Sequence, residues 1–262
     1  MVDVDKKRMV FAFYLNENSL ENPINQIHFS FIEKYINKFD EVIFGIIIDE
    51  GLNPYYIQEF EKKILSFYHK NITFHIYENS QYREAIVFYN EVATKLELLD
   101  GITFYAHNKH TSDMSIEELV IWVCGLYYFN LELPLEYHFT GICFFGSPLL
   151  TDVDFNIAAV RNKYRWYFAG NFYWIKCQEV YRFMVNNNLK LPLLTNRYYS
   201  EMFPGELWEH KGFASTPFGT YVCGNGWDIS YIYMNLYYGE NQWIFDEFYE
   251  VYKEKLKMVQ ND

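Results

Sequence analysis

The stretch EVIFGIIID, residues 41–49, decides the fold class of this chain. Its β-branched and aromatic residues form one continuous apolar run, which is typical of a strand buried on both faces of a parallel sheet. The run ends at Glu50-Gly51-Leu52-Asn53-Pro54, a turn-forming sequence. We therefore predict an α/β protein.

The same pattern recurs along the first half of the chain. Apolar runs at 10–15, 41–49, 72–77 and 101–106 predict strands, and apolar residues at helical spacing predict helices between them, at 21–38, 56–68 and 83–99. This alternation predicts a mostly parallel central sheet flanked by helices. Ligands of such sheets bind beyond the carboxyl ends of the strands. The residues to inspect are therefore Asn16, Asp49, Glu50 and the stretches 78–80 and 107–113.

The second half is aromatic and less regular. A helix begins at Ser115, and helical patterns return at 175–186 and 243–259. Aromatic residues make up 21% of the chain, which excludes a disordered or coiled-coil protein. Because no repeat or linker divides the sequence, we predict a single domain, 1–262, with a first half at 1–114 and an aromatic second half at 115–262.

Charge and hydropathy exclude several classes of partner. The chain has 34 acidic and 22 basic residues, so its net charge of −12 repels nucleic acid and anionic lipid on average. No apolar stretch approaches the roughly 18 residues that span a bilayer, and the first residues carry no signal-peptide cleavage pattern. The 4 cysteines form no CxxC pair and are typical of reduced, buried thiols. We expect a cytoplasmic protein with no transmembrane segment.

A polar cluster, FYAHNKHTSD at 104–113, follows the last of the predicted strands of the first half. Lys109, with imidazole and hydroxyl donors around it, predicts a site for a diphosphate. His107, His110 and Asp113 leave a metal site open as an alternative. A plain polar loop that leads into the Ser115 helix is the other alternative.

The stretch YFAGNFYW, residues 167–174, predicts an aromatic wall for a sugar. Gly170 permits close backbone approach, and the rings beside Asn171, from Phe172 to Trp174, offer apolar faces to the C–H groups of a sugar. The alternative is an aromatic core strand.

Glu201 is a carboxylate embedded in aromatic sequence, NRYYSE at 196–201. Partial desolvation there favours use as a general base. The alternative is a surface carboxylate paired with Arg197. Asp152 and Asp154, separated by one residue, form a weaker pattern that can chelate Mg²⁺ or Mn²⁺ across a diphosphate.

Taken in order, these pieces resemble a group of bacterial and viral glycosyltransferase-like proteins. The pieces are GITFYAHNKHTSD, the helix with Trp122, YFAGNFYWIK and NRYYSEMFPGELW, which together span roughly residues 80–210. The group is similar to enzymes of capsule, O-antigen and rhamnan-type polysaccharide synthesis. The resemblance implies a GT-A-like, Rossmann-like fold, with a nucleotide-sugar-binding half at 1–114 and an acceptor-binding half at 115–262. Family members commonly show His-x-Lys-Gly in the first motif, where this chain has His110 in place of the glycine.

The resemblance also implies roles for individual residues. The segment at 107–109 stands where many GT-A enzymes keep a metal-binding Asp-x-Asp, so use of Mn²⁺ or Mg²⁺ stays open. Glu201 corresponds to the acidic residue that deprotonates the acceptor hydroxyl in inverting enzymes. The residues implied to bind the donor and its diphosphate are His107, Asn108, Lys109, Arg83 and Glu84. Those implied to bind the sugar or acceptor are Gly170, Asn171, Phe172, Trp174 and Arg197.

The sequence thus predicts an inverting glycosyltransferase of polysaccharide or glycan synthesis, which moves a sugar from a nucleotide diphosphate sugar to a carbohydrate hydroxyl. A non-catalytic carbohydrate-binding or scaffold protein with the same fold is the alternative. A nucleotidyl- or phosphotransferase is disfavoured, because the chain lacks a GxxxxGK[ST] phosphate loop.

Overall fold

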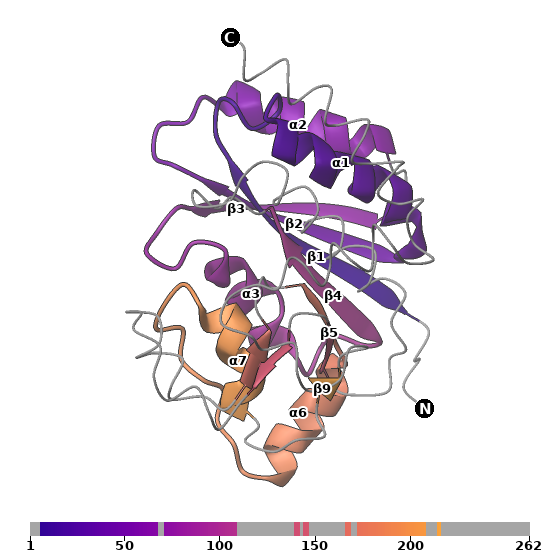
Figure 1. Cartoon of the computed structure of the whole chain (residues 1–262), viewed down its shortest axis with the longest axis vertical. Helices are drawn as coiled ribbons and strands as arrows, with labels where there is room; N and C mark the ends of the chain where they lie inside the picture. Colours follow the sequence, from indigo (N-terminus) through magenta and orange to yellow (C-terminus); the bar gives the residue numbers. More distant parts are fainter. Residues whose placement is uncertain are drawn as a thin grey trace.

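Parallel strands form the centre of the fold (Figure 1). The computed structural model describes residues 6–67, 71–108, 139–141, 144–146, 166–168, 172–207 and 214–215. The parallel strands are β1 (Lys7–Leu15), β2 (Glu41–Ile48), β3 (Asn71–Glu78) and β4 (Ile102–His107). They lie in the order β3-β2-β1-β4. The α/β fold with a mostly parallel sheet that the sequence predicts is confirmed.

Short strands from the second half of the sequence extend this sheet beyond β4. They run antiparallel to β4 in β8 (Tyr173–Ile175) and reverse again in β5 (Phe139–Gly141), which pairs in parallel with β9 (Ala214–Ser215). A separate antiparallel pair consists of β6 (Phe144–Gly146) and β7 (Trp166–Phe168). One sheet therefore combines strands from both halves of the sequence.

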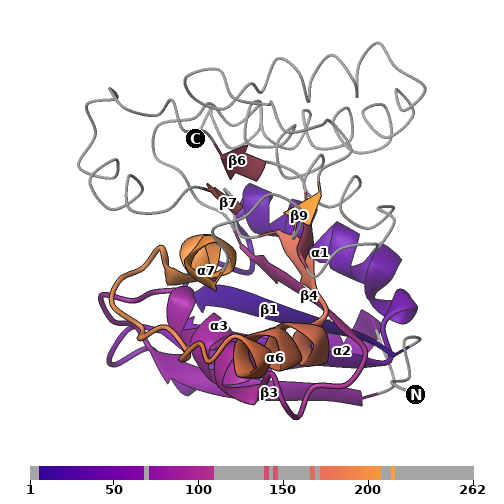
Figure 2. The same ribbon diagram turned by 90° about the horizontal axis from the view of Figure 1, so that it is seen from below.

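Helices cover the two faces of the sheet (Figure 1). On one face lie α1 (Pro23–Tyr35) and α2 (Pro54–Phe67). On the other lie α3 (Ala85–Glu91), α6 (Cys177–Asn186) and α7 (Tyr199–Leu207), which are on the near side in Figure 2. The helix expected at 83–99 is shorter than predicted, because it gives way to a 3₁₀ turn, Ala93–Lys95. The helices expected from Ser115 and at 243–259 lie outside the described residues.

Alternate residues of β1 pack into two hydrophobic cores, one on each face of the sheet. Phe11 and Phe13 face α1 and α2, where the Phe13 ring lies 5.5 Å from Phe29 and 4.5 Å from Phe60, centroid to centroid. Val10 and Ala12 face the other way, into the cluster formed with α3, α6 and α7. A strand buried on both faces has no polar side, which explains the unbroken apolar runs in the sequence. Much of the aromatic content of the first half is therefore core.

Gly45 in β2 allows α3 to approach the sheet closely. A Cβ atom at this position would overlap the methyl groups of Val87 on α3. The resulting contact holds the start of α3 against the sheet, and the segment before α3 carries Arg83 and Glu84. A packing constraint in the core thus fixes a part of the chain that reaches the candidate site.

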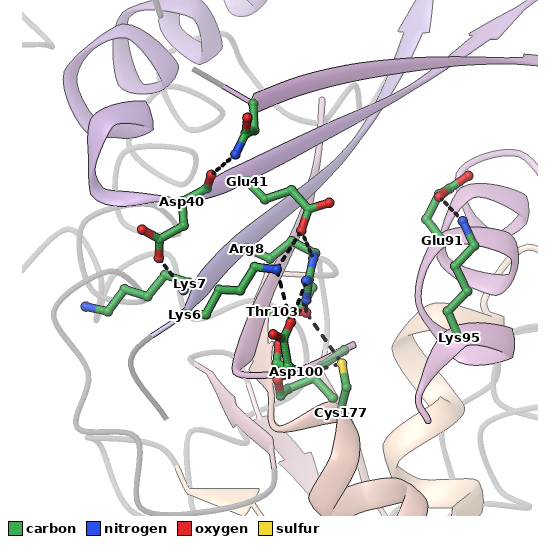
Figure 3. A network of polar contacts seen from close by, with 12 residues as sticks. Lys6, Lys7, Arg8, Asp40, Glu41, Glu91, Lys95, Asp100, Thr103 and Cys177 are labelled. Atoms are coloured by element: carbon green, nitrogen blue, oxygen red, sulfur yellow. Dashed lines mark hydrogen bonds and ion pairs between the residues drawn. The ribbon is translucent and has the colours of Figure 1, made fainter. Parts of the chain in front are cut away.

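Charged residues form ion pairs at the amino-terminal ends of the parallel strands (Figure 3). The buried Arg8 side chain pairs with Glu41 (Nε–Oε2 2.7 Å) and with Asp100 (Nη2–Oδ1 3.1 Å). Burial alone would raise the pKa of Asp100, but hydrogen bonds from Lys6 and Arg8 outweigh it and hold that pKa below its usual value. The network ties β1 to β2 and to the turn before β4.

Cys177 is a buried free thiol beneath this network, 3.4 Å from the Thr103 hydroxyl (Figure 3). Burial raises its pKa to about 11, so the reactive thiolate is scarce at neutral pH. The other cysteines, Cys124, Cys143 and Cys223, lie outside the described residues. Within the described part of the chain, no helix is long and apolar enough to cross a membrane.

A buried carboxylate joins α3 to the edge strand β3. Glu91 accepts hydrogen bonds from His75 Nδ1 (2.6 Å), Lys95 Nζ (2.7 Å) and the Tyr77 hydroxyl. Its side chain is 3% exposed. Burial alone would raise the pKa of Glu91, but the bonds from Lys95, Tyr77 and His75 outweigh it and lower that pKa below 4.5.

Glu91→Gln is expected to remove a stabilising contribution that depends on pH. A carboxyl whose pKa is lowered by folding stabilises the protein above its unfolded pKa, and the contribution is lost as pH falls through the folded pKa. The variant should lose about 1–3 kcal/mol of unfolding free energy at pH 7, and this difference from wild type should shrink below about pH 4. Urea unfolding across pH measures it.

Glu59→Gln is the matched control, because Glu59 makes an ion pair at 3.7 Å with Lys62, whose side chain is 78% exposed. A difference between wild type and Glu91→Gln that stays constant from pH 7 to pH 3 would contradict the assignment.

Candidate functional site

The strand order places a crevice between β1 and β4. From β1 the chain moves outward through β2 and β3, then returns to the other side of β1 as β4. At such a switch point the connections leave β1 and β4 in opposite directions, which opens a space at their carboxyl ends. A cavity of about 590 Å³ lies there, within the size range of small-molecule sites. Its lining residues are Tyr14, Asn16, Asn18, Ser19, Asn22, Asn25, Ile47, Asn79, Arg83, Glu84, His107, Asn108, Arg197, Tyr198 and Glu201.

The cavity brings together several of the residues predicted from the sequence. They come from the segment before α3, from the carboxyl end of β4 and from the start of α7. The predicted residues in the lining are Arg83, Glu84, His107, Asn108, Arg197 and Glu201. Lys109, Gly170, Asn171, Asp152 and Asp154 lie outside the described residues.

Phe172 and Trp174 lie elsewhere, in the core. Trp174 belongs to β8, which lies between β4 and β5 within the sheet. The centroid of its ring lies 5.1 Å from that of Phe104 and 5.8 Å from that of Phe39. Phe172 is fully buried, with its ring 5.8 Å from the His107 ring. Neither side chain is among the described residues that line the cavity, so a sugar-binding role at these two positions stays a prediction. The alternative weighed from the sequence, an aromatic core strand, describes both.

Most of the cavity wall that runs from the end of β1 to the first turn of α1 is not predicted by the sequence. The sequence points to Asn16 only through its place after the first strand, and it gives no separate indication for Tyr14, Asn18, Ser19, Asn22 or Asn25. The available signal was an unusual density of asparagine, NENSLENPIN at 16–25, in a loop that follows the central strand.

The Asn108 side chain fixes the ends of β1 and β4. Its Oδ1 accepts from the Tyr14 backbone N–H at 2.7 Å, and its Nδ2 donates to the Tyr14 carbonyl at 3.0 Å. The same Nδ2 donates to Asn25 Oδ1 at 3.2 Å. The carboxamide thus takes the ladder position of one further β4 residue. Since both amide hydrogens have protein partners, Asn108 holds the wall in place.

The amino terminus of α1 faces the cavity with its hydrogen-bond donors already used. Asn22 Oδ1 accepts from Ile24 N at 2.9 Å and Asn25 N at 3.3 Å, and Pro23 has no N–H. The loop before it, 16–22, contains no glycine. Dinucleotide-binding and P-loop sites need both a glycine-rich loop and free helix N–H groups. An anion beside this end of α1 must therefore be bound by side chains.

Two arginines line the cavity from segments far apart in the sequence. Neither Arg83 nor Arg197 has an ion-pair partner within the described residues. The Arg197 guanidinium lies 4.6 Å from the centroid of the Tyr198 ring and donates to the Tyr198 hydroxyl, which restricts its movement. Arg83 has a left-handed backbone conformation (φ 47°), which non-glycine residues adopt uncommonly.

Carboxylates lie close to these cations. Glu201 is 6% exposed and stands in the first turn of α7, which begins after an Asx turn made by Asn196 Oδ1 and the Tyr198 N–H (2.8 Å). The exposed Asp49 accepts from the Tyr14 hydroxyl and from Asn79 Nδ2 (2.6 Å), and both of these partners line the cavity. The bond to Asp49 raises the pKa of Tyr14 to about 12 and lowers the pKa of Asp49. The ends of β1, β2 and β3 are thereby joined.

Within the described residues, no group of three or more His, Cys, Asp or Glu side chains is arranged to hold a metal ion. No protein-family model matches this chain, and no curated protein matches it either. The chemistry of the cavity itself therefore supports the functional inference.

Asn108→Leu should destabilise the protein by about 1–3 kcal/mol, because it leaves the Tyr14 N–H and carbonyl without their partners in a buried place. Urea unfolding measures the loss. Asn18→Ala, an exposed change in the same wall, should shift the unfolding free energy by less than about 0.5 kcal/mol. Equal shifts for the two variants would show that the carboxamide does not hold the strand ends.

Proposed function

We propose that this chain is a glycosyltransferase with a GT-A-like fold, which transfers a sugar from a nucleoside diphosphate sugar to a carbohydrate hydroxyl with inversion. The observation that carries the proposal is one cavity at the switch point of the sheet. Arg83 and Arg197, which have no ion-pair partner within the described residues, line it together with the buried Glu201.

The arginines support a doubly anionic ligand. The chain has 34 acidic residues, and its buried Arg8 is paired with two carboxylates. Arg83 and Arg197 have no such pairing in the part of the chain described. A guanidinium matches phosphate oxygens with two parallel N–H donors, and cations on two walls suit a diphosphate better than a single carboxylate.

The asparagine wall supports an uncharged, hydroxyl-rich remainder of the ligand. Asn16, Asn18 and Asn22 carry amide groups at the cavity. The Oδ1 atoms of Asn16 and Asn22 already accept from protein donors, so these two residues offer their Nδ2 groups as donors, whereas the Asn18 amide can donate and accept. Ribose and sugar hydroxyls do the same. The occupied helix terminus and the glycine-free loop argue against a dinucleotide cofactor and against a P-loop phosphotransferase.

In the proposed reaction, the acceptor hydroxyl oxygen bonds to the anomeric carbon as the bond from that carbon to the diphosphate oxygen breaks. Glu201 takes the proton of the hydroxyl, a general-base contribution of about 10²–10⁴ in rate. Arg83 and Arg197 stabilise the charge that grows on the departing diphosphate, and His107 and Lys109 are the further donors proposed from the sequence. Glu84 is proposed to contact the nucleotide. A divalent metal, Mn²⁺ or Mg²⁺, enters the proposal only through Asp152 and Asp154, where it would supply additional charge to the diphosphate.

Glu201→Gln should lower kcat by about 10²–10⁴ while leaving nucleoside diphosphate affinity unchanged. Arg83→Met and Arg197→Met should each weaken the binding of UDP or GDP by about 10- to 100-fold. A thermal-shift screen of nucleotide sugars identifies the donor, calorimetry measures affinity, and release of nucleoside diphosphate in the presence of glycan acceptors measures turnover. Arg182→Met, an exposed change on α6, is the control and should bind as wild type does.

Wild-type turnover by Glu201→Gln would remove Glu201 as the base. A wild-type protein that binds glycans but no nucleoside diphosphate would instead support the carbohydrate-binding alternative.

A further inference from the structure

Two fully buried tyrosines lie side by side in the sheet. Tyr105 on β4 and Tyr173 on β8 are direct partners in the antiparallel register. Their ring centroids are 6.1 Å apart, in an edge-to-face arrangement. Both rings pack in the core with α3 and α7, where phenylalanine would fill the same space. The hydroxyl groups therefore need a separate explanation, because a buried hydroxyl is costly unless it is hydrogen-bonded.

Each hydroxyl binds the backbone of a segment that lines the candidate site. The Tyr105 hydroxyl donates to the Glu84 carbonyl at 2.9 Å, and Glu84 follows Arg83 at the start of α3. The Tyr173 hydroxyl donates to the Ser200 carbonyl, next to Glu201. One cross-strand pair thus holds both the segment with the donor-side arginine and the segment with the proposed base.

The bond from Tyr173 supplies a donor that α7 lacks. In an α-helix the carbonyl of residue 200 accepts from the N–H of residue 204, four positions later. In this chain that residue is Pro204, which stands inside α7 and has no N–H. The Tyr173 hydroxyl takes the place of the missing donor, so the first turn of α7 is tied to the sheet instead of to its own second turn.

These anchors do not change with pH in the physiological range. Burial, with the nearby Glu84 charge, raises the pKa of Tyr105 well above its usual value. Burial, with neighbouring groups that include Tyr105 and Glu201, does the same for Tyr173. Both hydroxyls therefore stay protonated and remain donors.

We propose that Tyr105 and Tyr173 are positioning residues that set the distance between the Arg83–Glu84 segment and Glu201. The inference rests on the proposed function, because that distance becomes the register between the bound diphosphate and the attacking hydroxyl. Displacement at a carbon requires near-contact and alignment of the reacting atoms, and an error of about 1 Å can cost about 10²-fold in rate. Adjacent strands of one sheet form a rigid spacer for this purpose.

Tyr105→Phe and Tyr173→Phe remove one hydroxyl each and keep the ring. Tyr105→Phe should raise the KM for the nucleotide sugar with a smaller change in kcat, because it releases the donor-side segment. Tyr173→Phe should lower kcat by about 10- to 100-fold with little change in donor KM, because it releases the segment of the base. Tyr199→Phe is the matched control, since it loses a hydroxyl bond to the Pro192 carbonyl (2.8 Å) and should keep both constants.

A rescue variant separates positioning from general stability. Pro204→Ala restores an N–H that can bond to the Ser200 carbonyl, so adding it to Tyr173→Phe should recover most of the lost kcat. The proposal is overturned if both tyrosine variants keep wild-type constants. It is also overturned if Tyr199→Phe changes kcat and KM as much as the two test variants do, or if Pro204→Ala recovers none of the lost kcat.

Amide hydrogen exchange distinguishes failure of this inference from failure of the proposed function. A wild-type protein with no nucleotide-sugar turnover contradicts the proposed function. In that case Tyr105→Phe should still accelerate exchange selectively in α3, and Tyr173→Phe selectively in α7, as anchoring requires. Acceleration spread evenly over the protein, or none, would overturn the anchoring itself.

Discussion

The hydrogen bonds between the Asn108 side chain and the Tyr14 backbone set the geometry on which the candidate site depends. Parallel strands pair through evenly spaced backbone bonds, and β1 and β4 do so up to Ala12 and His107. Beyond that point the Asn108 carboxamide continues the ladder and fixes the end of β1. The same carboxamide reaches Asn25 in α1, which binds the Ser19 carbonyl at 2.9 Å. A single side chain therefore supports the strand ends and the asparagine wall.

The amino-terminal and carboxyl-terminal ends of the parallel strands differ in how their charges are arranged. At the amino-terminal ends, Arg8 forms ion pairs with Glu41 and Asp100, an arrangement that suits a structural role. At the carboxyl ends of the strands, Arg83 and Arg197 have no ion pair within the described residues, and several amide side chains line the same cavity. The net charge of the whole chain does not predict the charge at either end of the strands, because the local arrangement of charged groups decides what binds there. An acidic chain can thus hold a site suited to an anion.

Several of the predictions from the sequence succeeded because they rest on local rules. Apolar runs located the strands β1 to β4, and the rule that ligands bind beyond strand ends pointed to Asn16 and to the stretches that contain Asn79 and His107. Predictions that depend on long-range pairing were weaker. The sequence predicts a sugar-binding wall that includes Phe172 and Trp174, whereas β8 lies between β4 and β5 and both rings are buried. The local sequence of a strand such as β8 does not reveal which strand will be its neighbour in the sheet.

The sequence by itself determined the α/β class, the positions of the parallel strands and the types of residue at their ends, because hydrophobic period and turn chemistry are local properties. Only the tertiary structure decided which of these residues meet. Arg83 and Arg197 are separated by more than a hundred positions along the chain and line one cavity because β4 and β8 pair and their tyrosines bind the two segments. Only the tertiary structure shows the consequence of the missing N–H of Pro204, because it brings the Tyr173 hydroxyl to the Ser200 carbonyl as the replacement donor.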